Sequence, residues 1–318
     1  MKKPVLLLIY NRPKETLRLF RAIEKIKPRF LYIFSDGPKK NEADIKKNNL
    51  VKKIFNNISW RCEVKFKYLD ENLGCKYAVK KALDWFFCSC EMGIILEDDC
   101  IPGKDFFRFA NLMLKKYQNR SNVFTISGNN FLKNNIKISE SYYFSKYNHC
   151  WGWASWRRAW VQNDFRMNAW PKLKSTNYWN DLHETNSEKK YWKKIFNHCK
   201  SDKIDSWAYP WLYSIWKNKG INILPSKNLV KNIGFGQNAT HTVSSKKINY
   251  RLDSLSKPIR HPAIFRVNKK ADLYTYENFI KGCNFLWPRR GVYLIIFLFT
   301  DPKSFFIKIT KAFRNIFI

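Results

Sequence analysis

Short apolar stretches alternate with helical patterns through the first hundred residues. Four stretches of strand length, each followed by polar residues, are predicted as strands at residues 4–9, 30–34, 64–69 and 93–96. Between them, apolar residues recur at helical spacing, which predicts one helix that begins near Pro13 and others at residues 42–55 and 76–87. Strands and helices that alternate in this way predict an α/β fold with a parallel sheet and right-handed crossovers.

The second predicted helix should turn one apolar face inward, formed by Leu50, Val51, Ile54 and Phe55. A further helix is expected from Gly103 to Lys116, with a strand after it at residues 123–127. The composition then changes, because ten of the 13 tryptophans fall between Trp151 and Trp216. We therefore expect three segments, at residues 1–130, 131–245 and 246–318.

The fourth strand stops at three consecutive carboxylates, Glu97, Asp98 and Asp99. Adjacent acids at the end of a buried strand repel one another and lose solvation, which is costly unless a cation is bound there. Ligands of open α/β sheets bind beyond the carboxyl ends of the strands. A solvated acidic turn is the alternative for an isolated Glu-Asp-Asp. Polar turns also follow the other predicted strands. Because these turns should lie along one edge of the sheet, they favour a binding site over a solvated turn.

Composition limits the classes of function. A hydrophobic content of 45% and a charged content of 26% indicate a globular chain, and the net charge of +34 indicates an anionic partner. The sequence has no P-loop and no GxGxxG fingerprint, which disfavours an ordinary kinase or dehydrogenase. The eight cysteines form no CxxC pair, and residues 5–9 are too short for a signal peptide. We therefore expect free thiols in a reducing, cytoplasmic setting.

Four motifs in order resemble those of a known family: Tyr10-Asn-Arg-Pro13, Ser35-Asp-Gly37, Asn72-Leu-Gly74-Cys-Lys76 and Glu97-Asp-Asp99. Over roughly residues 4–242, the chain resembles glycosyltransferases of the GT-A fold, in particular bacterial relatives of the N-acetylglucosaminyltransferase I type. The resemblance implies a Rossmann-like, mostly parallel sheet. It also implies a nucleotide-sugar-binding half at residues 1–130 and a Trp-rich acceptor and catalytic half at 131–245. The basic composition of residues 246–318 indicates a separate C-terminal extension.

The resemblance makes Glu-Asp-Asp the form of the metal-binding DxD motif. Asp99 would bind Mn²⁺ or Mg²⁺, which holds the diphosphate of a nucleotide sugar, while Asp98 and Glu97 would face the donor. A hard cation takes oxygen ligands and neutralises a departing diphosphate, so the chemistry agrees. The remaining donor-binding residues implied in this half are Asn11, Arg12, Asp36 and Lys76. For Arg12 and Lys76 the alternative is an ordinary surface cation.

Three residues of the Trp-rich half, Trp151, Gly152 and Trp153, would lie over the donor sugar by the same resemblance. Aromatic faces stack on sugars, but they also stack on bases or fill cores. The family also places its general base on an Asp that opens a helix, which corresponds to Asp205 and implies inversion at the anomeric carbon. A simple N-capping role is the alternative for Asp205. His241 is a further candidate for the metal shell, with a structural role as its alternative.

The C-terminal segment is basic. Its apolar run at residues 292–299 has eight residues, whereas a membrane-spanning helix needs about 20. Apolar residues from Phe305 to Phe317 follow helical spacing with Lys308, Lys311 and Arg314 off that face. This pattern predicts a basic amphipathic helix on a membrane surface, or else a helix docked on the protein's own core.

These observations favour a metal-dependent glycosyltransferase that is peripheral on the inner face of a bacterial cytoplasmic membrane. It would move a sugar from a nucleotide donor, with UDP as the expected nucleotide, to a surface glycan or a lipid-linked acceptor. One alternative is a nucleic-acid-binding protein that uses basic charge and stacking, but that leaves the carboxylates unexplained and we expect no nucleic acid partner. Another is a sugar nucleotidyltransferase, which the glycine-free stretch from Ile9 to Pro13 disfavours.

Overall fold

The computed structural model describes residues 3–132, 135–234 and 251–280. Its strands are β1 (Val5–Ile9), β2 (Phe30–Ser35), β3 (Glu63–Tyr68), β4 (Met92–Glu97), β5 (Cys100–Pro102), β6 (Val123–Ser127), β7 (Tyr142–Ser145), β8 (Trp153–Trp156), β9 (Ile221–Pro225) and β10 (Val230–Asn232). Its helices are α1 (Pro13–Glu24), α2 (Glu42–Ile54), η1 (Phe55–Asn57), α3 (Gly74–Ser89), α4 (Lys104–Lys116), α5 (Arg157–Trp160), α6 (Trp170–Leu173), α7 (Asn177–Asp181), α8 (Asn186–Lys200), α9 (Ala208–Lys217), α10 (Lys269–Thr275) and η2 (Tyr276–Ile280).

Eight strands form one sheet in the order β3-β2-β1-β4-β8-β6-β9-β7. Strands β1 to β4 pair in parallel, β8 lies antiparallel between β4 and β6, and β9 is parallel to β6. The edge strand β7 is antiparallel to β9. Six strands therefore run in one direction and two in the other. The predicted α/β fold with a Rossmann-like, mostly parallel sheet is confirmed.

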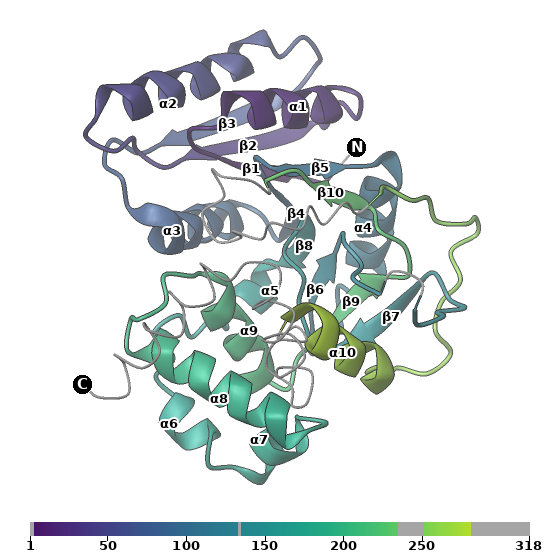
Figure 1. The fold of residues 1–318 in the computed structure, drawn as a ribbon. Coiled ribbons are helices and arrows are strands. Elements are labelled where there is room, and N and C mark those ends of the chain that lie inside the picture. Colours follow the sequence, from purple (N-terminus) through teal and green to yellow (C-terminus); the bar gives the residue numbers. More distant parts are fainter. Residues whose placement is uncertain (1–2, 133–134, 235–250, 281–318) are drawn as a thin grey trace, which may run out of the picture.

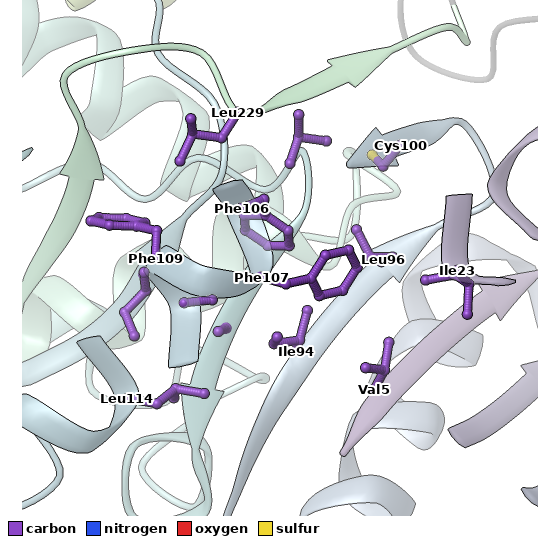
Figure 2. Close-up of a cluster of buried hydrophobic side chains, with 14 of the residues drawn as sticks. Val5, Ile23, Ile94, Leu96, Cys100, Phe106, Phe107, Phe109, Leu114 and Leu229 are labelled. Carbon is purple, nitrogen blue, oxygen red and sulfur yellow. The ribbon is translucent and has the colours of Figure 1, made fainter. Parts of the chain in front are cut away.

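Helices cover both faces of the sheet, so its central strands are buried on both sides. Helices α1 and α2 lie over one face of β1 to β3, and α3 lies over the other (Figure 1). Alternate residues of β1 reflect this arrangement, because Val5 packs with α1 and α4 while Leu6 packs with α3. Figure 2 shows Val5 and Ile94 of the sheet with Ile23 of α1 and Phe107 of α4 in the first of these clusters.

The second cluster contains most of the tryptophans. It joins α3 to the helices from α5 to α9, which Figure 1 shows grouped below the sheet. The fully buried tryptophans are Trp153, Trp156, Trp170, Trp179, Trp192, Trp211 and Trp216. Of these, Trp156 packs in the first cluster and the others pack in the second. Filling of hydrophobic cores thus accounts for most of the tryptophan content.

Helix α2 departs from the predicted inner face at one position, because Val51 and Phe55 are buried and Ile54 packs against the same core, as expected. Leu50, the remaining predicted residue, is 46% exposed, and the polar residues Asp44 and Asn48 are buried instead. Polar side chains take the inward positions because they find partners there. Asn48 Nδ2 donates to the Tyr10 carbonyl at 2.9 Å, and Asp44 accepts from the Tyr10 hydroxyl at 2.6 Å. A hydrophobic pattern alone cannot anticipate such hydrogen bonds.

Residues 228–234, the described part of a run that contains glycines, include the short strand β10, which pairs with β5 in a separate two-stranded ribbon. The predicted amphipathic helix, the apolar run at residues 292–299 and His241 lie outside the described residues. Within the described ranges, every helix is too short or too polar to cross a membrane.

Candidate active site

A pocket of about 350 Å³ opens where β1, β2 and β4 end. Its walls include five of the residues predicted to bind the donor: Asn11, Arg12, Asp36, Glu97 and Asp98. The predicted base Asp205 also lines it, although it comes from the Trp-rich half of the chain. The other lining residues are Leu8, Ile9, Tyr10, Phe34, Lys39, Asn72, Gly74, Cys75, Ala78 and Val79. The fold therefore gathers the polar turns at one edge of the sheet.

Arg12 bridges the carboxylate turn. Its Nη1 lies 2.9 Å from Asp99 Oδ2 and 3.4 Å from Asp98 Oδ1. Arg12 directly precedes α1, where Pro13 begins the helix, so the helix start fixes the arginine opposite the end of β4. The carboxylate turn thus faces a positive charge that the chain itself supplies.

Glu97 and Asp98, the two residues of the carboxylate turn that line the pocket, hold their protons unusually strongly. Burial raises the pKa of Glu97 to about 8, and the nearby Asp99 and Asp98 charges add to this effect. Burial and the Asp99 charge raise the pKa of Asp98 to about 7, against the opposing influence of Arg12. Three carboxylates in one turn favour protonation or a bound cation, which is the electrostatic condition expected of a cation site.

The β5–β10 ribbon holds Asp99 in place. Asn232 Nδ2 and the Cys100 thiol lie 3.4 Å from Asp99 Oδ1, and the Ile233 N–H donates to the Asp99 carbonyl at 2.8 Å. Gly234 approaches so closely that a Cβ there would meet Asp99 Oδ2 at 2.0 Å. Any larger side chain at this position would have to displace the carboxylate. Sequence reasoning missed this ribbon, although Gly234 within a strand-like run was the available signal.

The donor set of the turn suits a hard divalent cation, because Mn²⁺ and Mg²⁺ take carboxylate oxygens. The Arg12 contacts show that Asp98 and Asp99 present oxygens to positive charge. Within the described part of the chain, no group of three or more His, Cys, Asp or Glu side chains is arranged to hold a metal ion. A cation here would therefore need further ligands from a phosphate or water, which is usual for Mg²⁺.

Asp36 organises the loop between β3 and α3. Its Oδ1 accepts the N–H groups of Gly37 and Leu73, and its Oδ2 accepts the Gly74 N–H and the Asn72 amide, all at 2.9–3.1 Å. Burial raises the pKa of Asp36 despite these hydrogen bonds. A carboxylate has about four acceptor positions, so Asp36 has all of them engaged by the protein. It lines the pocket as a support for the loop.

Asp44 of α2 supports the turn after β1, whose residues Tyr10 and Asn11 line the pocket. It accepts from the Tyr10 hydroxyl, the Asn11 side-chain amide and the Lys39 N–H. These hydrogen bonds lower the pKa of Asp44 although burial alone would raise it. Sequence reasoning missed Asp44 as a supporting residue. The available signal was the spacing of Asp44, Asn48 and Val51, which places the acid on the same inward face of α2 as Val51.

Lys76 and Asp205 lie on two adjoining segments. Lys76 is buried and forms an ion pair with Asp202, and it does not line the pocket. This pair fastens the loop at residues 201–207, which carries Asp205, to the first turn of α3. Asp205 is exposed, and the cap position of α9 belongs to Trp207, so the structure does not show the N-capping alternative for Asp205.

The predicted sugar-stacking residues lie deeper in the fold. Trp153 is 1% exposed and stacks on Trp207, with ring centroids 5.8 Å apart. Trp151 is half-buried and contacts the Phe131 ring edge to face at 5.0 Å. The Gly152 carbonyl accepts the Gly128 N–H at 2.7 Å. None of the three lines the pocket.

No protein-family model matches the chain, and no curated protein matches it. Among solved structures, it is similar to a mannosyltransferase from Pyrobaculum calidifontis in complex with GDP-Man and Mn²⁺. The identity is 13%, the match covers 69% of this chain and 70% of that chain, and the TM-score is 0.41. It is also similar to HddC from Yersinia pseudotuberculosis, with 12% identity, 49% and 77% coverage and a TM-score of 0.32. A third similar structure is an apo UDP-glucose pyrophosphorylase, with 11% identity, a match that covers 73% of this chain and 93% of that chain, and a TM-score of 0.36.

Proposed function

We propose that this protein is a glycosyltransferase that moves a sugar from a nucleotide-diphosphate donor to a glycan or glycolipid acceptor. One observation supports this most strongly: a single pocket is lined by Glu97 and Asp98 of the carboxylate turn, by Arg12, which contacts Asp99, and by a separate carboxylate, Asp205, from another part of the chain. Transfer to a hydroxyl group needs a charge stabiliser at the leaving group and a base at the acceptor, and these are the two kinds of group present.

The donor would bind along the strand ends. The Arg12 guanidinium has the charge and fork geometry that suit a diphosphate. The apolar side chains of Phe34, Ala78 and Val79 offer surface for the nucleoside, and Asn11 offers a side-chain amide beside it. Asp36 supports the loop with Asn72 and Gly74 against this wall, so we assign it a positioning role.

Asp99 would hold Mn²⁺ or Mg²⁺, with Asp98 and Glu97 beside it. When bound, the cation would neutralise the charge that develops on the departing nucleoside diphosphate. Gly234 and Asn232 keep the Asp99 carboxylate in its position. Arg12 would add a second positive charge at the same place.

Asp205 would take the proton from the acceptor hydroxyl. Its side chain is exposed at the pocket, so an acceptor can reach it from solvent. A base on the side of the sugar opposite the leaving group implies inversion at the anomeric carbon. We further propose that the acceptor is a surface glycan or a lipid-linked glycan, and that the protein works at the cytoplasmic face of a bacterial membrane.

The test is a panel of nucleotide sugars examined by calorimetry with and without Mn²⁺. We expect Mn²⁺-dependent binding of one nucleoside diphosphate, lost in Asp99→Asn. In Asp205→Asn we expect retained donor binding and turnover reduced by at least about a hundredfold, because only the proton acceptor is removed. Metal-independent binding in Asp99→Asn would overturn the cation role, and near-normal turnover in Asp205→Asn would overturn the base. Release of pyrophosphate from a nucleoside triphosphate and a sugar phosphate would identify a nucleotidyltransferase instead.

A further inference from the structure

The surface segment at residues 254–271 carries a strong positive charge and no acid. It contains Lys257, Arg260, Arg266, Lys269 and Lys270 together with His261. In Figure 1, this light green segment runs along the right-hand edge of the molecule before it enters α10. The acid that ends it, Asp272, is buried and accepts hydrogen bonds from Ser145 and Lys146. Asp272 therefore does not neutralise the exposed cations, although Lys269 forms an ion pair with Glu184 at 3.2 Å.

Two adjacent apolar side chains stand at the surface of this segment. Ile264 is 66% exposed and Phe265 is 39% exposed. The Phe265 ring packs against Tyr117 of the α4 cap and Phe144 of β7, with centroids 6.2 and 4.5 Å away. The aromatic anchor fixes the segment on the protein, while Ile264 next to it points most of its surface into solvent.

A cavity of about 240 Å³ lies at the same place, between the segment and the end of α4. Two cations line it, Lys116 of α4 and Arg120 of the turn after it, and the Arg120 guanidinium lies 5.6 Å from the centre of the Phe265 ring. The described residues that complete its lining are Tyr117, Phe144, Pro262, Ala263 and Phe265, and none of the lining residues is an acid. The cavity thus combines an apolar wall with positive charge.

Helix stability explains part of this arrangement, since cations near the end of α4 complement the helix dipole. It does not explain an isoleucine and a phenylalanine exposed beside them, nor an acid-free segment on the opposite wall. Exposed apolar side chains beside cations favour entry into the headgroup region of anionic bilayers, because apolar burial and attraction to anionic lipids both contribute to binding.

We propose that this surface, formed by Lys116, Arg120, Arg260, Ile264, Phe265 and Arg266, docks onto an anionic lipid bilayer. Ile264 would enter the boundary between headgroups and acyl chains, Phe265 would hold it in place on the protein, and the cations would contact the headgroups. Charge complementarity selects an anionic bilayer over a neutral one. The docking surface shares no residue with the pocket at the strand ends, so it stands independently of the proposed transfer reaction.

The test measures binding of the full chain to vesicles of phosphatidylcholine alone and with about a third of anionic phosphatidylglycerol. Sedimentation gives the partition coefficient, and hydrogen–deuterium exchange locates the protected segments. We expect protection at residues 259–268 with anionic vesicles only. The double variant Lys116→Gln/Arg120→Gln should lower the partition coefficient at least about tenfold, because each cation near an anionic surface contributes about fivefold. Ile264→Gln should lower it severalfold.

Matched controls are Lys46→Gln/Lys47→Gln for charge and Val161→Gln for an exposed apolar side chain, since Val161 is 71% exposed elsewhere on the molecule. Both should leave partitioning unchanged. The proposal would be overturned if the controls lowered the partition coefficient as much as the test variants did. Protection from exchange confined to other segments would also overturn it. Protection of residues 259–268 by inorganic phosphate without vesicles would show a small-anion site and would also overturn it.

Discussion

Arg12 contacts Asp99, which we propose as a cation ligand, and the adjacent carboxylate Asp98. Its Nη1 contacts Asp99 Oδ2 and Asp98 Oδ1, so the cation must compete with the guanidinium unless a diphosphate draws the arginine away. We therefore predict that Arg12→Gln binds Mn²⁺ alone about fivefold more tightly, which corresponds to about 1 kcal/mol for a partly exposed ion pair. The same variant should bind the nucleoside diphosphate more weakly. Electron paramagnetic resonance of free Mn²⁺ measures the first effect.

Arg18→Gln is the matched control for Arg12→Gln, because Arg18 is exposed on the same helix. It should change neither affinity. An unchanged or weaker Mn²⁺ affinity in Arg12→Gln would show that the arginine does not compete with the cation.

Glu97 makes the stability of the metal-free protein depend on pH. Its pKa is about 8 in the folded chain, because it is buried beside Asp99 and Asp98, and near 4.5 when unfolded. The raised pKa favours the folded state fully below pH 4.5, and this advantage is lost as the pH rises towards 8. In the unsubstituted protein, the free energy of unfolding should fall by up to about 1.4 kcal/mol per pH unit over this range, and we predict that Glu97→Gln removes this decline. Urea unfolding in EDTA at pH 6 and pH 8 measures it. Parallel slopes in both proteins would contradict the raised pKa.

The ion pair between Lys76 and Asp202 connects two elements, α3 and the loop that carries Asp205. We predict that Lys76→Met frees this loop and lowers turnover about tenfold, because small misplacements of a catalytic group are costly. Donor affinity should stay within about twofold. Lys80→Met is the control, since Lys80 pairs with Asp84 on the surface of the same helix. A loss of donor affinity without a loss of turnover at saturation would instead support direct donor contact by Lys76.

Local patterns were sufficient to predict most elements of the first half. The strand expected at residues 4–9 is β1 (Val5–Ile9), and that expected at 93–96 is β4 (Met92–Glu97). Buried parallel strands are apolar throughout, so they are visible in the sequence. The convergence of Asn11, Asp36 and Asp98 on one pocket followed from the same reasoning, because parallel strands bring their carboxyl ends to one edge.

Interactions between distant residues were not visible in this way. The roles of the polar side chains in and near the pocket depend on such interactions: Asp36 supports a loop of the pocket wall, and Lys76, outside the pocket, forms an ion pair with Asp202. The position of β8 depends on them too, since nothing in the four residues Trp153–Trp156 indicates a place between β4 and β6. Tryptophans at 153 and 156 look equally suited to a sugar and to a core, and only packing separates the two roles.

The sheet is continuous across the two predicted halves of the molecule, because β8 of the second half lies between β4 and β6 of the first. We therefore predict that the described body unfolds as one unit. Tryptophan fluorescence reports mainly on residues 151–216, and circular dichroism reports on helices along the whole chain. The two signals should have the same urea midpoint. Separate midpoints would show that the halves unfold independently.

The place of β8 also has a consequence for synthesis. Strand β4 pairs with β1 on one side and with β8 on the other. Because β8 follows β4 by many residues in the sequence, it leaves the ribosome long after β4. Until then, the nascent chain exposes an unpaired apolar strand edge, which is a template for association with other chains. Slower translation or a holding chaperone during this interval should therefore matter for the yield of native protein.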